Sequence, residues 1–244
     1  MHPDAALAVE RVARVGTPDD GMPAHFRRVV SFHPRGGRLN PVQRRAWDTH
    51  ADQWFVEPTT DFDDRRLFGR AAPLVVEIGS GMGEATAAMA ASRPEINLLA
   101  VEVYKPGVAQ TFHHVARAGV DNVRVMRADG IDVLENVLRP GSLAELWLFF
   151  PDPWPKTRHL KRRLVTPAFA KLAASRLRKR GVLRMATDWQ PYAEQMLAAC
   201  GNEPKLKNRY TGWAPRPDFR TRTRFERRGL LAGHDIFDLE FYRV

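Results

Sequence analysis

The chain has 244 residues, which is enough for one large hydrophobic core and predicts one main domain. Its single cysteine, Cys200, excludes a disulfide framework and a CxxC zinc site and indicates a reducing compartment, the cytoplasm. The formal net charge of +10 favours a polyanionic partner, and no apolar run approaches the roughly 20 residues that a membrane span needs. The first fifteen residues carry acids and lack a sustained apolar core, so we expect no secretory signal.

Residues 1 to 60 contain glycine, proline and charge without a sustained hydrophobic period. We predict an N-terminal arm over residues 1–60, partly flexible, followed by the main domain over residues 61–244. The arginines between Arg27 and Arg45 either meet a polyanion or pack the arm on its own domain, and the sequence leaves both open.

From Leu74 onwards, strand-like and helix-like segments alternate at the spacing of βα units. This pattern predicts an α/β fold with a doubly wound, mostly parallel sheet and helices on both faces. Runs such as LVVEI and NLLAVEV are nearly continuously apolar, as expected of strands that are buried on both faces. We predict strands at residues 74–78, 97–103, 122–127, 144–150 and 182–187, a closing strand in the tail IFDLEFYRV, helices near 84–92, 106–118, 131–138, 167–179 and 191–199, and a basic loop over 205–228.

The first predicted strand runs into a glycine turn, EIGSGMGE. Gly79, Gly81 and Gly83 permit a tight turn and a close approach of the backbone to a ligand at the start of a helix. Glu102 ends the second predicted strand, where a carboxylate accepts hydrogen bonds from both hydroxyls of a ribose. The turn therefore predicts a nucleoside site.

Acids around this turn distinguish between nucleotide cofactors. Glu77 and Glu84 flank the glycines and would repel a pyrophosphate, whereas a cofactor with an ammonium group and no phosphate suits Glu77. S-adenosylmethionine meets that requirement. Asp129 follows the third predicted strand, where it either accepts a hydrogen bond from the adenine amino group or caps the next helix.

A proline-rich loop follows the fourth predicted strand. Three prolines at alternate positions in PDPWP fix the backbone and hold Asp152 and Trp154 in set directions. We predict that Asp152 lies in a pocket. Trp154 either stacks on a nucleic-acid base or packs in the core, and the sequence does not separate the two.

A basic segment begins directly after this loop. Between Lys156 and Arg184 there are eleven lysines and arginines and no aspartate or glutamate. A solvated face normally mixes both signs of charge, so we predict one phosphate-binding patch beside the pocket.

With these residues in view, the chain resembles the bacterial tRNA (guanine-N7)-methyltransferases. PDPWPKTRHLKRR is a specific motif of that family, and VEIGSGMG, EVYKPGV, TDWQPYAEQML and TRFERRG occur in the family's order between about Pro73 and Gly229. The resemblance implies a Rossmann-like class I methyltransferase fold with a seven-stranded sheet. It also implies S-adenosylmethionine as the methyl donor, no metal, and tRNA as the partner, methylated at N7 of the variable-loop guanosine, position 46. We expect a monomer or homodimer.

The resemblance also implies the roles of individual residues. The catalytic residue would be Asp152, which would also contact the cofactor. The other implied contacts are Glu77, Gly79, Gly81, Gly83, Glu102 and Asp129 with the cofactor, Lys156, Asp188, Thr223, Arg224, Phe225 and Glu226 with the substrate, and Arg158, His159, Leu160, Lys161, Arg162 and Arg163 with RNA.

Guanine N7 has an exposed lone pair and no proton to lose, so methylation there requires alignment rather than a general base. A carboxylate beside the purine would stabilise the developing positive charge or hold the base. Asp152 and Asp188 are the candidates, and their two roles remain interchangeable at this point.

Three other functions compete with this interpretation. An adenine amino methyltransferase carries a (D/N)PPY tetrad, which PDPW resembles only superficially. A non-catalytic RNA-binding module has no use for Glu77, Glu102 and Asp129 together. A nicotinamide dehydrogenase requires GxGxxG, whereas the spacing here is GxGxG.

Overall fold

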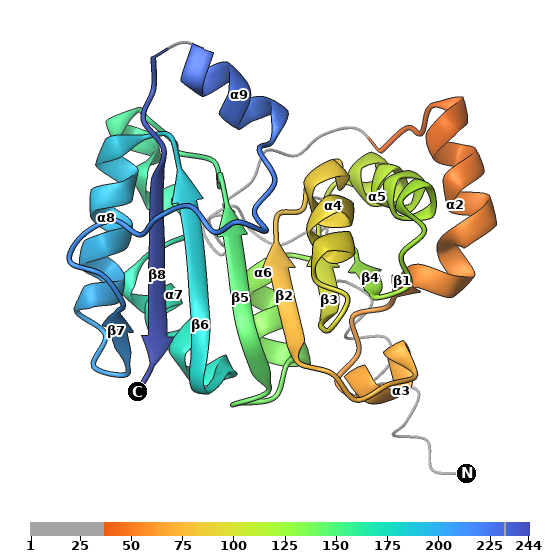
Figure 1. Ribbon diagram of the computed structural model, residues 1–244, viewed down its shortest axis with the longest axis horizontal. Helices are drawn as coiled ribbons and strands as arrows, with labels where there is room; N and C mark the ends of the chain where they lie inside the picture. Colours follow the sequence, from red (N-terminus) through yellow and green to blue (C-terminus); the bar gives the residue numbers. More distant parts are fainter. Residues whose placement is uncertain (1–36, 232) are drawn as a thin grey trace, which may run out of the picture.

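An eight-stranded β-sheet, in the order β1-β4-β3-β2-β5-β6-β8-β7, organises the part of the chain that the computed structural model describes, residues 37–231 and 233–244 (Figure 1). Neighbouring strands are parallel except β8, which runs antiparallel to β6 and β7. The predicted doubly wound, mostly parallel sheet is confirmed, and β1 adds a two-residue edge strand to the seven implied. The strands are β1 Phe55–Val56, β2 Leu74–Ile78, β3 Asn97–Val101, β4 Val123–Met126, β5 Leu143–Phe149, β6 Leu177–Thr187, β7 Leu206–Asn208 and β8 Phe237–Arg243.

Several helices begin where the sequence supplies a cap. The Asn40 side chain accepts a hydrogen bond from the backbone of Gln43 at 2.9 Å, and the Gln43 side chain accepts one from the backbone of Asn40 at 3.1 Å. Thr166 caps α7 in a similar way, because its hydroxyl oxygen accepts a hydrogen bond from Phe169 N. The helices are α2 Pro41–Trp54, α3 Asp64–Phe68, α4 Glu84–Ser92, α5 Lys105–Ala118, α6 Gly130–Asp132 with a π-helical continuation Val133–Val137, a 3₁₀ helix Thr157–Arg162, α7 Pro167–Arg176, α8 Gln190–Gly201 and α9 Arg224–Leu231.

Two elements fall within residues 205–228, which we predicted as a loop. This prediction is wrong for β7, which pairs with the end of β8, and for α9, which begins at Arg224. Strand β7 has only three residues, which is too short to show a period, and α9 is so polar on average that its few apolar residues form no apolar run. Tertiary contacts described below hold α9 in place.

Part of the predicted N-terminal arm packs on the domain. Helix α2 lies against α5, and the Trp47 ring is 5.7 Å from the ring of Phe112 (Figure 1). We found no helical period there because α2 buries only three of its fourteen residues, Gln43, Ala46 and Trp54. Residues 1–36 lie outside the described residues, and the division at residue 60 stays a prediction.

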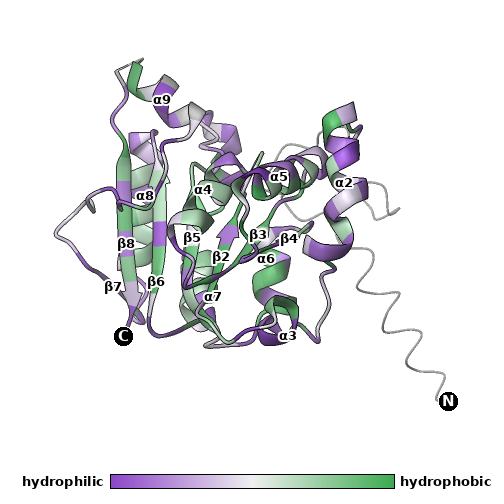
Figure 2. Cartoon of the chain, turned by 45° about the vertical axis from the view of Figure 1, so that its right-hand side comes forward, coloured by the Kyte–Doolittle hydropathy of each residue, from purple (hydrophilic) through white to green (hydrophobic). Residues whose placement is uncertain are grey.

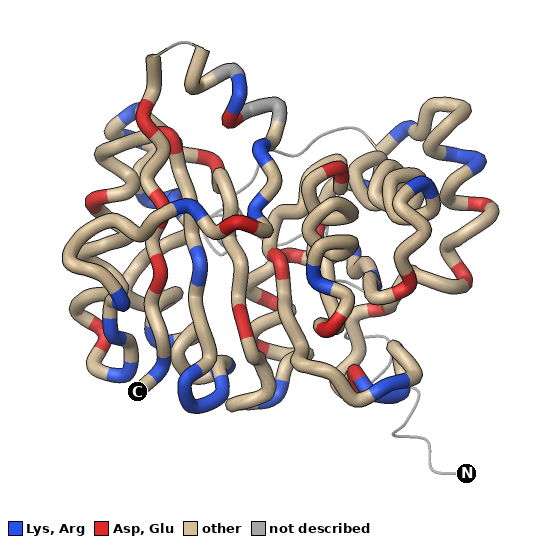
Figure 3. The backbone as a smooth tube through the Cα atoms, in the orientation of Figure 1, with Lys and Arg blue, Asp and Glu red and all other residues tan. Residues whose placement is uncertain are grey.

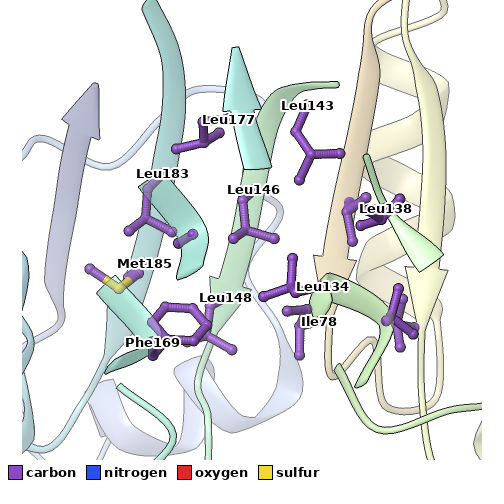
Figure 4. Close-up of a cluster of buried hydrophobic side chains, with 14 of the residues drawn as sticks. Ile78, Leu134, Leu138, Leu143, Leu146, Leu148, Phe169, Leu177, Leu183 and Met185 are labelled. Carbon is purple, nitrogen blue, oxygen red and sulfur yellow. The ribbon is translucent and has the colours of Figure 1, made fainter. Parts of the chain in front are cut away.

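The sheet is buried on both faces by two separate hydrophobic clusters. Successive residues alternate between them: Val76 and Leu99 face the cluster under α7 and α8, while Val75 and Leu98 face the cluster under α4 and α5. Figure 2 shows the resulting green strands in the middle of the molecule. Figure 4 shows the first cluster, in which side chains of β5, β6 and α7 lie together: Leu146, Leu148, Leu183, Met185 and Phe169.

The strand order reverses between β2 and β5, which are neighbours in the sheet. In open α/β sheets, ligands bind at such a reversal, beside the carboxyl ends of the strands. We call this end of the sheet the carboxyl edge. Helix α9 lies over it, and the segment before α9 crosses in front of β6 and β5 (Figure 1). Within the described ranges, no helix has the length and apolarity needed to cross a membrane.

Candidate active site

The glycine turn after β2 has the backbone conformation that its sequence predicts. Gly79, Gly81 and Gly83 all have positive φ, at 79°, 61° and 76°. A Cβ on Gly83 would lie 2.2 Å from the Thr111 hydroxyl, so the turn packs directly on α5. A Cβ on Gly107 of α5 would likewise lie 2.4 Å from the carbonyl oxygen of Gly81. The turn and α5 are therefore fixed against each other by the absence of side chains.

Glu102, the first residue after β3, is anchored to this turn. One carboxylate oxygen accepts a hydrogen bond from Gly81 N at 2.8 Å, and the other accepts one from Tyr104 N at 2.9 Å. These bonds hold the carboxylate beside the glycine turn at the carboxyl edge. This is the position that ribose recognition requires.

Glu77 is a buried carboxylate at the base of the turn, 5% exposed. It accepts a hydrogen bond from the Thr86 hydroxyl at 2.7 Å. The pKa of Glu77 is raised to about 7, mainly by burial and to a smaller extent by the nearby charge of Glu102, while the hydrogen bond from Thr86 lowers it. The neighbouring Ser80 Oγ is buried and has no hydrogen-bond partner among the described residues. A ligand cation here would stabilise the ionised form of Glu77.

Asp129 lies at the same edge, after β4. Its side chain accepts a hydrogen bond from Ile131 N at 2.8 Å and caps α6. The capping alternative is therefore realised. The contact between Asp129 and adenine stays a prediction.

The proline-rich loop after β5 turns sharply at both ends. Phe150 and Trp154 have positive φ, at 52° and 42°, which is strained for residues other than glycine. Asp152 between them is exposed. Trp154 is only 4% exposed, and the Arg162 guanidinium lies 3.6 Å from its ring centroid. Trp154 is therefore a core residue that supports the loop, and the base-stacking alternative is not realised.

Arg163, which we assigned to RNA contact, has a different role in the structure. It is 6% exposed and donates hydrogen bonds to the Pro153 carbonyl and to Gln195 Oε1, each at 2.8 Å. Its guanidinium also lies over the Tyr192 ring at 4.9 Å. Arg163 ties the proline-rich loop to α8 and does not face RNA.

The remaining predicted RNA contacts lie on the 3₁₀ helix Thr157–Arg162, next to the exposed Lys156. Arg158, Leu160 and Lys161 are exposed, and His159 and Arg162 are half-buried. Their contact with RNA stays a prediction. This helix places them beside the loop that carries Asp152.

The C-terminal segment is held at the carboxyl edge by a buried ion-pair network, which we call the arginine clamp: Arg220, Glu226 and Asp238. Arg220 is 1% exposed. Its guanidinium donates to both oxygens of Glu226, at 2.8 and 3.2 Å, and to both oxygens of Asp238, at 3.0 and 2.8 Å. It also lies 5.7 and 5.5 Å from the rings of Phe149 and Phe150, which lead into the Asp152 loop. The clamp joins α9, β8 and β5 at one point.

The clamp corrects the role of Glu226. We assigned Glu226 to substrate contact, but it is 1% exposed and both of its oxygens are bonded to Arg220. It therefore positions the segment around it. Thr223 accepts a hydrogen bond from Glu226 N at 3.0 Å and is half-buried. Arg224 and Phe225 begin α9, and the structure does not describe their side chains.

Asp188 follows β6 and lies under α9. One of its oxygens is 3.7 Å from His234 Nδ1. A Cβ on Gly229 would lie 3.3 Å from the same oxygen, so α9 packs closely on the aspartate. Asp152 and Asp188 therefore follow adjacent strands, β5 and β6, at one edge.

The basic segment from Lys156 to Arg184 is not one patch, so that prediction is wrong. The chain runs from the carboxyl edge through α7 to the opposite end of the sheet, where Arg178, Lys179 and Arg180 lie (Figure 3). Arg184 lies within β6 and pairs with Glu145 and Glu240. Only the cations near the 3₁₀ helix lie beside the predicted pocket.

Comparison with known proteins identifies the family. The family described as putative methyltransferase (Methyltransf_4) matches residues 71–239. The tRNA (guanine-N(7)-)-methyltransferase of Burkholderia cenocepacia is 46% identical over 224 residues, which cover 91% of this chain and 88% of that protein. That of Paraburkholderia xenovorans is 47% identical over 218 residues, covering 89% and 84%. The chain belongs to the tRNA (guanine-N7)-methyltransferase family.

Solved structures agree with this family's fold. The 16S rRNA methyltransferase KamB has a TM-score of 0.56 at 17% identity, and the alignment covers 76% of this chain and 94% of that one. TrmN from Thermus thermophilus has a TM-score of 0.51 at 14% identity, covering 74% and 47%. At these identities the likeness shows the Rossmann-like methyltransferase fold.

We predict that Glu77 makes stability depend on pH. Its pKa in the fold, about 7, is above its ordinary value of 4.5, so the unfolded chain releases this proton first as pH rises. The free energy of unfolding should therefore fall between about pH 4.5 and 7, by on the order of 3 kcal/mol from this group. Chemical denaturation of cofactor-free Glu77→Gln across this range should lack this component. An exposed control, Glu135→Gln, should retain it; parallel profiles for Glu77→Gln and the unmodified chain would contradict the prediction.

We predict that Arg163 and Arg158 contribute very differently to the stability of the fold, although they are close in sequence. Arg163→Gln should lower the free energy of unfolding by about 1 to 3 kcal/mol, because it leaves the Pro153 carbonyl and Gln195 without their donor. Arg158→Gln, on the exposed surface, should change it by less than about 0.5 kcal/mol. Urea titrations of both variants test this prediction. Equal stabilities would contradict the buried, structural role of Arg163.

Proposed function

We propose that this chain transfers the methyl group of S-adenosylmethionine to N7 of the variable-loop guanosine, position 46, of tRNA. The observation that carries the proposal is the family match over residues 71–239, which contains every loop of the carboxyl edge described above. The relatives that bear this activity in their names are 46 to 47% identical over most of their length. The adjacency of β2 and β5 supports it, because the glycine turn and the Asp152 loop then follow neighbouring strands at the carboxyl edge.

The residues around the glycine turn fit S-adenosylmethionine. The buried Glu77 carboxylate with its raised pKa suits an ammonium group, which would offset the cost of its ionisation. The Glu102 carboxylate, anchored by Gly81 and Tyr104, suits the ribose hydroxyls. No side chain blocks the backbone of Gly79 and Gly81, where a Cβ would meet nothing within 4 Å. Asp129 is proposed to meet the adenine amino group.

Asp152 and Asp188 are proposed to act on the guanine from two adjacent strands. When bound, S-adenosylmethionine supplies an electrophilic methyl group: the N7 lone pair forms the new N–C bond, the C–S bond breaks, and S-adenosylhomocysteine leaves. The two carboxylates align the base and stabilise the positive charge that develops on it. No proton leaves N7, so neither aspartate is required as a base.

We propose that the proline-rich loop and the clamped C-terminal segment build the substrate side of the site. Lys156 and the residues Arg158 to Arg162 would meet RNA, Thr223, Arg224 and Phe225 would line the base, and Glu226 would hold them in place through Arg220. We further propose that the enzyme acts in the cytoplasm without a metal ion, as a monomer or homodimer.

Incubation with labelled S-adenosylmethionine and unmodified tRNA tests the proposed function. Nuclease digestion and mass analysis should yield N7-methylguanosine at position 46. N6-methyladenosine would assign the chain to the adenine amino methyltransferases. Binding of tRNA without any labelled product and without heat on titration with S-adenosylmethionine would identify a non-catalytic RNA-binding module.

Asp152→Ala should reduce methyl transfer by roughly a hundredfold or more while the fold stays intact, because its exposed side chain supports no described core contact. Single-turnover rates with tRNA and circular dichroism measure the two effects. Asp121→Ala, another exposed aspartate away from the carboxyl edge, is the matched control. Full activity of Asp152→Ala would remove this residue from the site.

A further inference from the structure

A second group of cations lies at the end of the sheet opposite the candidate active site. We call it the amino-edge cluster: Arg178, Lys179, Arg180, Lys205, Lys207 and Arg243. The first three interrupt β6 near its start, where Leu177 pairs with Leu143 at the amino end of β5. Strand β7 joins them because Leu206 pairs with Arg243 at the end of β8. The Arg243 guanidinium donates to the Leu177 carbonyl, so three segments meet here (Figure 3).

Three of these cations are carried on a bulge that projects from the sheet. Leu143 and Glu145 of β5 pair with Leu177 and Val182, so one intervening residue on β5 faces four on β6. Arg178, Lys179 and Arg180 are all exposed. A Cβ on the following Gly181 would lie 2.8 Å from the Arg178 carbonyl oxygen, which fixes the bulge tightly against its own strand.

The bulge contains an arginine at a position whose backbone conformation favours glycine. Arg180 has φ of 64°, in the left-handed region that strains residues with a Cβ. If these cations served only to keep the protein soluble, none of them would have to occupy a strained position, because any exposed site nearby would serve equally well. Strain of this kind is concentrated at functional positions.

The charge around the cluster is unbalanced. The described acid nearest in sequence is Glu203, whose side chain accepts a hydrogen bond from Lys205 N at 3.2 Å. Glu240 of the neighbouring strand is paired with Arg184 and Arg209. The acids of α3 and of the turn before β3 lie beyond β5 in the strand order. An excess of positive charge of this kind is typical of a surface that binds phosphates.

We propose that the amino-edge cluster binds the phosphate backbone of the same tRNA whose guanosine enters the carboxyl edge. The inference rests on the proposed function. Seven-residue β5 separates the two edges by about 23 Å, a distance that one folded RNA spans with its backbone. In this proposal the lysines and arginines of the cluster contact phosphates and no bases, so they contribute affinity and orientation but no sequence specificity.

The test replaces the bulge cations with Arg178→Gln, Lys179→Gln and Arg180→Gly. The glycine relaxes the left-handed residue, so the bulge is preserved. The logarithmic salt dependence of tRNA binding should become shallower by about 2 units, since each lost phosphate contact removes about 0.7 to 0.9. The KM for tRNA should rise about tenfold or more near physiological salt, with kcat and the affinity for S-adenosylmethionine unchanged.

A matched control changes three other exposed cations of the same end of the molecule: Arg65→Gln, Arg66→Gln and Arg117→Gln. It removes the same charge and should leave the salt slope within error. A short hairpin that presents the guanosine but cannot reach the amino edge should be methylated equally well by the unmodified chain and the bulge variant.

Different results would overturn the proposed function and the role of the amino-edge cluster. If the unmodified chain forms no N7-methylguanosine, the proposed function fails. If it does, and the bulge variant keeps the full salt slope and KM for tRNA, the amino-edge cluster is not an RNA surface. Loss of binding to anionic phospholipid vesicles in the bulge variant, with tRNA binding unchanged, would assign the cluster to a membrane surface and overturn the inference.

Discussion

The carboxyl edge depends on one buried guanidinium. Arg220 neutralises two carboxylates that are themselves almost fully buried, and burial raises the pKa of Asp238 while Arg220 opposes that rise. Removing one partner of such a pair costs about 3 to 5 kcal/mol, because a buried charge is left uncompensated. The four hydrogen bonds and the two phenylalanine rings beside the guanidinium fix its direction as well as its charge. Through this contact, the C-terminal segment and the Asp152 loop become parts of one surface.

The proposed site has two halves, one for the cofactor and one for the substrate, and they are built in different ways. The cofactor half is made by the backbone of the glycine turn and by carboxylates at the ends of β2 and β3, so it depends on the sheet itself. The substrate half is made of loops, and arginines in the interior hold it: Arg163 fastens the proline-rich loop to α8, and Arg220 fastens α9. Binding energy for a long RNA can then orient the guanosine against a cofactor half that does not have to move.

The sequence predicted the sheet and the cofactor half well, because both leave local patterns. Apolar runs alternate with helical periods, and the turn needs glycine at positions where φ is positive. The substrate half was predicted less well. Arg163 and Arg220 look like any other arginine of a basic segment, and only the fold shows that they are buried. The basic segment appeared as one patch because its members are close in the chain, whereas α7 carries the chain to the other end of the sheet. Helix α2 was missed because it buries too few residues to show a period.

The central claim is that a sulfonium donor and a guanosine meet between the ends of β2 and β5. A structure of the chain with S-adenosylhomocysteine and a guanosine-containing tRNA tests it most directly. We predict the amino-acid part of the cofactor product at Glu77, its ribose at Glu102, and guanine N7 facing the sulfur from the side of Asp152. A guanosine bound at another edge of the sheet, or an adenine ring in the place beside Asp152, would contradict it.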